Sequence, residues 1–189
     1  AQQVQSRTAH PGGSAGSELP LVEEIVPIPD SQAAFMRLAS LPHCLFLDSA
    51  MKHPELGRYS FLSADPYDFL QCHQRGEDAI GQVQQKLDLL AASTPAHHRE
   101  DLPPFQGGAA GLFGYDLAYS LENLPPPHND ELQVPTLAVG FYDVILALDH
   151  FENRAWIISQ GLPETEPGRR VERARQRADR KSTRLNSSH

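Results

Sequence analysis

Apolar residues recur along the chain in short runs separated by Pro and Gly, a pattern typical of strands joined by turns. The longest run, Thr136 to Asp149, is rich in β-branched and aromatic residues. Arg154 to Gln160 repeats this composition after a short polar link, which predicts a hairpin. Arg58 to Ala64 and Tyr67 to Gln71 predict two more strands, separated by the turn signal Asp65-Pro66 and expected to pair as neighbours.

Two further strands are predicted nearer the N-terminus. Leu21 to Ile28 ends at Pro29 and suits an edge strand, because proline cannot donate to a sheet ladder. Cys44 to Leu47 is wholly apolar and suits a buried central strand. It ends at the polar pair Asp48-Ser49, whose oxygen atoms predict a strand end that caps itself or holds a small ligand.

Helical spacing of apolar residues appears in three places. The clearest is Asp78 to Ala92, where Ile80, Val83 and Leu87 fall three and four residues apart. A short helix follows the cap at Asp30 or Ser31, and a basic helix is predicted over 169–178. Strands and helices together predict an α+β fold of antiparallel sheets packed as a sandwich with flanking helices.

Composition indicates the class of domain, and charge limits the kinds of partner it can bind. The 189 residues, 40% hydrophobic and with 16 Pro and 13 Gly, suit one compact strand-rich domain. Eight of the 16 Lys and Arg residues lie between Arg169 and Arg184, so the remainder holds eight basic and 22 acidic side chains. So acidic a body disfavours nucleic acid or an anionic membrane as a partner.

The two ends of the sequence differ from the body. Residues 1–18 are rich in Gln, Ser and Gly, and we expect a disordered or linker tail there. Residues 179–189 resemble a translated sequencing adapter, so we expect the domain to span 19–178 and the natural protein to continue beyond Ala178. With no apolar run long enough to span a bilayer and no signal pattern, a cytoplasmic protein is expected.

The sequence offers little catalytic machinery. Cys44 and Cys72 lack the spacing of a zinc site or disulfide framework, and the His residues show no ligand spacing, so no metal site is expected. The Gly-rich segment, with Gly108, Gly111 and Gly114 spaced by three, matches no phosphate loop. We interpret these glycines as positions where another backbone approaches closely.

A longer signature is more specific. Leu102-Pro103-Pro104-Phe105-Gln106-Gly107-Gly108-Ala109-Ala110-Gly111-Leu112-Phe113-Gly114-Tyr115-Asp116-Leu117, closed by Leu121-Glu122-Asn123-Leu124-Pro125, resembles aminodeoxychorismate synthase component I. Leu45 to Ser49, Arg58 to Pro66 and Leu137 to His150 match that family in the same order. The resemblance implies the N-terminal domain shared with anthranilate synthase component I.

This resemblance implies an activity for the complete protein, amination of chorismate to 4-amino-4-deoxychorismate on the path to p-aminobenzoate and folate. A glutamine amidotransferase, component II, would supply the ammonia. The chorismate site, its Mg²⁺ carboxylates and its lysine nucleophile would lie beyond Ala178, so the chain is expected to hold no catalytic residue and to be inactive alone. Anthranilate synthase component I and a non-catalytic tryptophan-binding module are the alternatives.

The same resemblance implies a tryptophan site. Ser49 matches a serine that contacts tryptophan in the family, and Leu56, Gly57, Arg58 and Tyr59 match the loop that closes over it. A serine hydroxyl and backbone groups suit an amino-acid zwitterion, and apolar strands suit an indole.

Overall fold

The fold is seen in a computed structural model that describes residues 5–7, 19–49, 51, 53, 56–73, 75–93, 97–125 and 131–186. The helices are α1 (Ser31–Leu38), α2 (Ala79–Ser93), α3 (Ala118–Leu121) and α4 (Pro167–Asn186), with a 3₁₀ turn, η1 (Tyr115–Leu117), before α3. The strands are β1 (Gln5–Arg7), β2 (Leu21–Val26), β3 (Leu45–Leu47), β4 (Tyr59–Ser63), β5 (Asp68–Cys72), β6 (Gly108–Phe113), β7 (Leu137–Tyr142), β8 (Val144–Asp149) and β9 (Arg154–Ser159).

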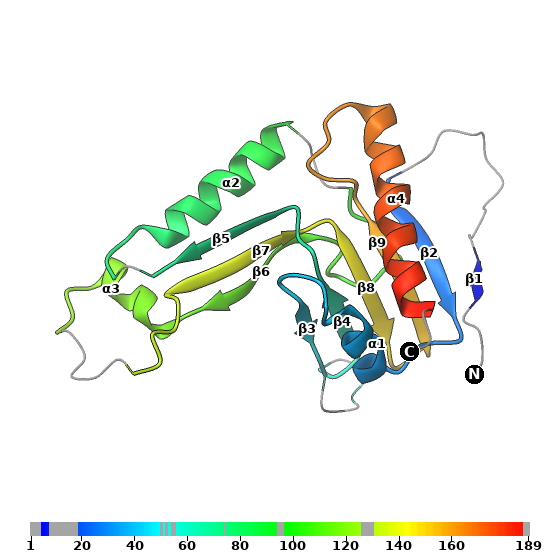
Figure 1. Ribbon diagram of the computed structural model, residues 1–189, viewed down its shortest axis with the longest axis horizontal. Helices are drawn as coiled ribbons and strands as arrows, with labels where there is room; N and C mark the ends of the chain where they lie inside the picture. Colours follow the sequence, from blue (N-terminus) through cyan, green and yellow to red (C-terminus); the bar gives the residue numbers. More distant parts are fainter. Residues whose placement is uncertain are drawn as a thin grey trace.

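The strands form two antiparallel sheets, so the α+β prediction is confirmed. One sheet has the order β1-β2-β9-β8-β4-β3 and the other has the order β5-β7-β6. The predicted long strand over 136–149 is interrupted at Asp143, and its halves β7 and β8 belong to different sheets. The smaller sheet with α2 extends from the larger one as an arm (Figure 1). The hairpin of β8 and β9 is confirmed, with Asp149 opposite Arg154.

One sequence-based pairing and two sequence-based strand positions are wrong. β4 and β5 do not pair, because the chain turns at Asp65, where φ is +55°, and passes from one sheet to the other. β4 instead lies between β3 and β8, and β5 pairs with β7. β3 is an edge strand rather than a central one, and β2 has β1 on its outer side. An apolar run of three or four residues does not show whether a strand is central or at the edge of a sheet, because a strand with only one buried face can have the same composition.

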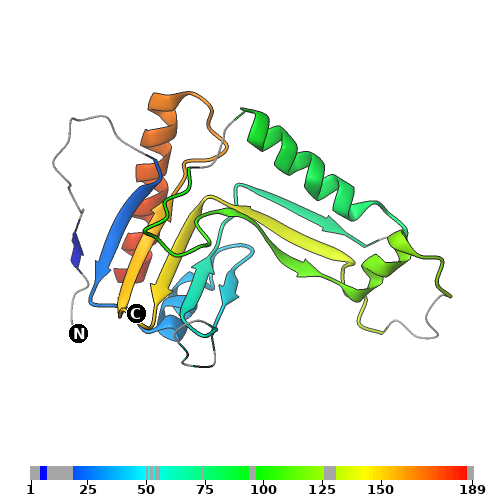
Figure 2. The ribbon, with the colours of Figure 1, turned by 180° about the vertical axis from the view of Figure 1, so that it is seen from behind.

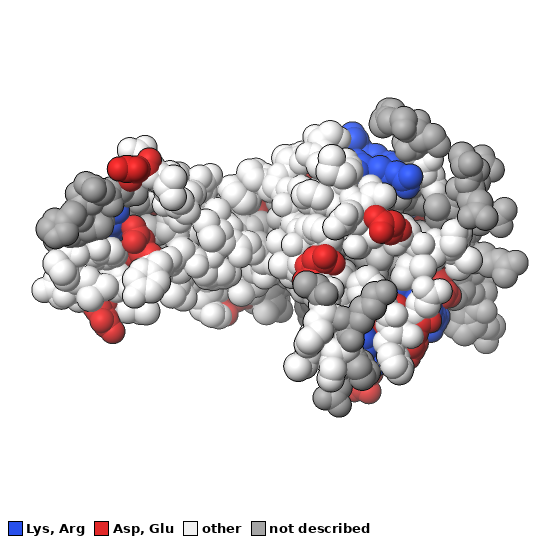
Figure 3. All heavy atoms as spheres, turned by 90° about the horizontal axis from the view of Figure 1, so that it is seen from below, with Lys and Arg blue, Asp and Glu red and all other residues white. Residues whose placement is uncertain are grey.

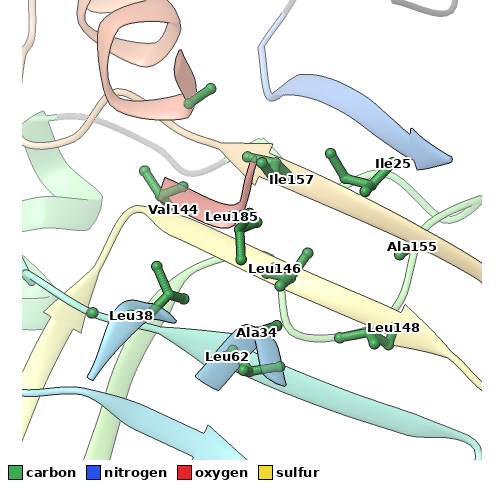
Figure 4. Close-up of a cluster of buried hydrophobic side chains, with 12 residues drawn as sticks. Ile25, Ala34, Leu38, Leu62, Val144, Leu146, Leu148, Ala155, Ile157 and Leu185 are labelled. Carbon is green, nitrogen blue, oxygen red and sulfur yellow. The ribbon is translucent and has the colours of Figure 1, made fainter. Parts of the chain in front are cut away.

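Helices α1 and α4 cover one face of the larger sheet. Figure 4 shows Ala34 and Leu38 of α1 and Leu185 of α4 pointing toward strand residues such as Leu62 and Leu146. Asp30 caps α1 as predicted, its carboxylate accepting a hydrogen bond of 2.8 Å from the Ala33 N–H. The opposite view shows the other face of both sheets (Figure 2).

α4 extends past Ala178, where the sequence predicts an interruption. Its buried positions recur at helical spacing on both sides of that residue: Arg170, Ala174, Ala178, Lys181, Ser182 and Leu185. The expectation of a break at Ala178 is therefore wrong, because Leu185 continues the buried face. The origin of residues 179–189 is independent of their conformation and stays a prediction.

In the arm, α2 packs on the smaller sheet. Ala79 and Val83 of α2 share a buried cluster with Leu137, Val139 and Phe141 of β7. The predicted helix over 78–92 is confirmed almost residue for residue.

The Gly-rich β6 lies against β7. A Cβ atom on Gly111 would stand 2.1 Å from the Ala138 carbonyl oxygen, so close backbone approach accounts for this glycine. Gly108 differs, because a Cβ there would meet only the Phe105 ring, at 4.0 Å. Its φ of +128° is the reason for glycine at that position.

Candidate functional site

The candidate site lies at one end of the larger sheet, where β3 and β8 end and β4 begins. Ser49 follows β3 and its hydroxyl donates a hydrogen bond of 2.5 Å to the Tyr59 carbonyl oxygen. The Arg58 carbonyl oxygen accepts one of 2.8 Å from the His150 N–H after β8. Hydrogen bonds therefore hold Ser49 beside Tyr59 and hold Arg58 beside His150 at this end of the sheet.

Ser60, fully buried, is the centre of the polar network. Its hydroxyl donates to Asp48 Oδ1 at 2.8 Å, and His150 Nε2 lies 2.7 Å away. A hydroxyl has one hydrogen, so Ser60 accepts from His150, whose Nε2 carries the proton. It accepts also from the Ser49 N–H at 3.3 Å. The proton of the Ser60 hydroxyl is thus directed at the Asp48 carboxylate.

Arg58 directly precedes β4 and is held by two carboxylates. Its Nε and one terminal nitrogen donate to Asp149 Oδ2 at 2.8 and 2.6 Å, and that nitrogen also donates to Glu152 Oε1 at 2.9 Å. The Arg58 guanidinium also lies 5.0 Å from the centre of the Tyr59 ring. Asp149 is 2% exposed and accepts two backbone hydrogen bonds, from Phe151 at 2.9 Å and Glu152 at 3.0 Å.

The protonation of Asp149 is set by these contacts. Burial by itself raises the pKa of the Asp149 carboxyl, but the hydrogen bonds from Arg58 and from the backbone outweigh it and hold this pKa below its ordinary value. The same pairing raises the pKa of Arg58. The ion pair is therefore present at neutral pH and fixes the start of β4 to the end of β8.

The remaining loop residues contribute differently. Leu56 is 79% exposed, and its N–H donates to His53 Nδ1 at 3.2 Å. Gly57 is buried, and a Cβ there would stand 1.4 Å from the Met51 carbonyl oxygen. The loop therefore requires glycine at 57 to pass this point, whereas the Leu56 side chain is exposed to solvent.

Sequence reasoning did not find Ser60, His150 and Asp149 as neighbours of Ser49. The available signals were a polar residue inside a predicted strand at Ser60 and the motif Asp149-His150 at a strand end. Only the pairing of Tyr59 with Asp149 across β4 and β8 brings them to Ser49.

The candidate site combines hydroxyl, imidazole, carboxylate and guanidinium groups. Among the residues that the structure describes, no group of three or more His, Cys, Asp or Glu side chains is placed to hold a metal ion. Within the same residues, no helix combines the length and apolar character that crossing a membrane requires. The Ser60 hydroxyl and the Arg58 guanidinium hydrogen-bond other groups of the protein. The Ser49 hydroxyl is half-buried and keeps lone pairs that can accept from a small zwitterion.

The chain is similar to several curated proteins. It is 34% identical over 158 residues to aminodeoxychorismate synthase component 1 of Escherichia coli, a match covering 70% of this chain and 34% of that protein. The protein of the same name from Salmonella typhimurium is 33% identical over 139 residues, covering 66% of the chain and 30% of the relative. Anthranilate synthase component 1 of Neisseria meningitidis is 26% identical over 188 residues, and this match covers 91% of the chain and 38% of the relative. No protein-family model matches.

The chain belongs to the family of component 1 synthases that includes aminodeoxychorismate synthase component 1 and anthranilate synthase component 1. The family expected from the Gly-rich signature is thereby confirmed. The matched region spans about a third of the length of these relatives.

Proposed function

We propose that this chain is the N-terminal part of an aminodeoxychorismate synthase component 1, which aminates chorismate to 4-amino-4-deoxychorismate in the cytoplasm. The observation that carries this proposal is the 34% identity to the Escherichia coli protein of that name, above the 26% to anthranilate synthases. Free Cys44 and Cys72 agree with a reducing compartment.

Formation of anthranilate is the second candidate. It is supported by the Neisseria relative, which matches 91% of the chain. Both reactions would start from chorismate, but the nitrogen would be added at a different ring carbon, and only anthranilate formation would also eliminate pyruvate, so the product discriminates between them.

The proposal includes two components outside this chain. A glutamine amidotransferase, the component 2 that the name component 1 implies, would supply ammonia. Mg²⁺ would be held by carboxylates in the part of the relatives that the match does not cover, where it would neutralise the charge of the substrate carboxylates. The 189-residue chain alone is expected to turn over no chorismate.

The test is a product assay on the polypeptide encoded at the same locus, with glutaminase, glutamine, Mg²⁺ and chorismate. The expected product is 4-amino-4-deoxychorismate, which a lyase converts to p-aminobenzoate for detection by chromatography. Anthranilate, detected by its fluorescence, would support the second candidate. No turnover in either assay, with tryptophan still bound, would favour a regulatory module.

We further propose that tryptophan binds where β3 ends and β4 begins. Ser49, Arg58 and Tyr59 are adjacent there, and Gly57 and Leu56 form the adjoining loop. The Ser49 hydroxyl, which donates to Tyr59, keeps its lone pairs for an ammonium group. The guanidinium of Arg58 is engaged by Asp149 and Glu152, so its role is to orient the loop.

A further inference from the structure

Among the residues that the structure describes, β6 forms a free edge of the smaller sheet. It pairs with β7 on one side, and no other described strand pairs with it. Natural edge strands are commonly protected by charged residues, proline or a covering segment. β6, with the sequence Gly-Ala-Ala-Gly-Leu-Phe over 108–113, carries none of those residues. At the opposite edge, β5 carries Asp68, which pairs with Lys86 of α2 at 2.5 Å.

Backbone groups of β6 point outward at alternate residues. The Gly114 N–H donates to the Thr136 carbonyl oxygen at 2.9 Å, which sets the phase of the ladder. Because hydrogen-bonded and non-hydrogen-bonded pairs alternate in an antiparallel ladder, the N–H groups of Ala109, Gly111 and Phe113 point away from β7. They are positioned to pair with one more strand.

Large apolar side chains gather at the same end of the arm. Leu112 is 43% exposed and Phe113 is 54% exposed, and the 3₁₀ turn adds Tyr115 at 93%. Leu121, Leu132 and Val134 near this end are also more than half exposed. Figure 3, which views the side opposite α2, shows a mostly uncharged surface along the arm. An exposed cluster of this kind marks an interaction surface.

We propose that the free edge of β6 pairs with a strand from the part of the same polypeptide that lies outside this chain, with Leu112 and Phe113 packing against it. This rests on the proposed function only in requiring a longer polypeptide. In the relatives, about two thirds of the length lies outside the matched region, and a strand from that part can reach this edge. An intramolecular strand covers the edge at any protein concentration, as an aggregation-prone edge requires.

The experiment compares amide hydrogen exchange in the 189-residue chain and in the complete polypeptide from the same locus. In the complete polypeptide, the amides of Gly111 and Phe113 are expected to exchange at least about tenfold more slowly. Leu112→Lys should remove much of this protection there and leave exchange in the 189-residue chain unchanged. The matched control is Met36→Lys, since Met36 is 71% exposed on α1, away from the arm.

Equal exchange in both proteins would overturn the proposal, as would a locus that encodes no further polypeptide. Protection that appears in the 189-residue chain with rising concentration, together with a dimer by light scattering, would assign the edge to a second copy and overturn it too. The proposed function is tested separately: unprotected β6 amides in a protein that aminates chorismate reject only the strand pairing. Protected amides without turnover reject only the activity.

Discussion

Arg58 and Asp149 are joined by two hydrogen bonds, of 2.8 and 2.6 Å, both to Asp149 Oδ2. The two residues lie 91 positions apart in the sequence, at the start of β4 and the end of β8. Asp149 also accepts the N–H groups of Phe151 and Glu152, so one buried carboxylate fixes both the hairpin turn and the candidate site.

Asp149→Asn should therefore destabilise the fold. The amide keeps one acceptor oxygen but loses the charge, leaving a buried site with imperfect hydrogen bonds, at a cost of about 1–3 kcal/mol in the free energy of unfolding. Glu152→Gln is the matched control, because Glu152 is the exposed partner of the same arginine and an exposed ion pair contributes about 0–1 kcal/mol. Urea unfolding measures both. Equal losses in the two variants would contradict the central role of Asp149.

The pH dependence of stability separates Asp149 from Asp143. The pKa of Asp149 is lowered in the folded chain, so its contribution is complete above the ordinary value near 3.8 and is lost as pH falls through the lower folded value. Burial raises the pKa of Asp143, which is fully buried, even though Arg177 Nε lies 2.8 Å away. Its contribution is present below the ordinary pKa and is lost as pH rises through the raised folded value.

The expected difference curves thus have opposite slopes. Between about pH 2 and 5, the stability of the wild type minus that of Asp149→Asn should rise with pH. The same difference for Asp143→Asn should fall as pH rises above about 4. Urea unfolding at a series of pH values gives both curves, and parallel slopes would reject the assigned pKa directions.

Local sequence patterns predicted most elements but not how the strands are ordered. The helix over 79–93 and the hairpin of β8 and β9 depend on short-range spacing, which is why they were found. The long strand is divided at Asp143 because its two halves pair with strands of different sheets, and such pairings between distant segments cannot be read from local spacing. Similarly, Ser49 was found by resemblance, whereas Ser60 and His150 required the register of β4 with β8.

The close contact of β6 with β7 gives a third prediction. In Gly111→Ala the new methyl group would overlap the Ala138 carbonyl oxygen, so one strand must shift, at about 1–3 kcal/mol or more. Gly168→Ala is the control, because a Cβ there first meets the flexible Glu166 carboxylate at 3.4 Å and alanine favours the helix. Thermal unfolding should show a lower Tm for the first variant and an unchanged or higher Tm for the second. An unchanged Tm for Gly111→Ala would show that β6 does not approach β7 as described.

Ser49→Ala tests the proposed tryptophan site. Loss of the hydroxyl removes an acceptor for the ligand and the 2.5 Å bond to Tyr59, while Gly57 and the Arg58–Asp149 pair still hold the loop. Calorimetry on the complete polypeptide should show tryptophan affinity reduced about three- to tenfold, the range of one hydrogen bond. Ser120→Ala is the matched control, since its hydroxyl donates a similar 2.7 Å bond to the Leu117 carbonyl oxygen, in the arm. Equal affinity in wild type and Ser49→Ala would remove Ser49 from the site, and equal losses in both variants would trace the effect to stability rather than to contact with the ligand.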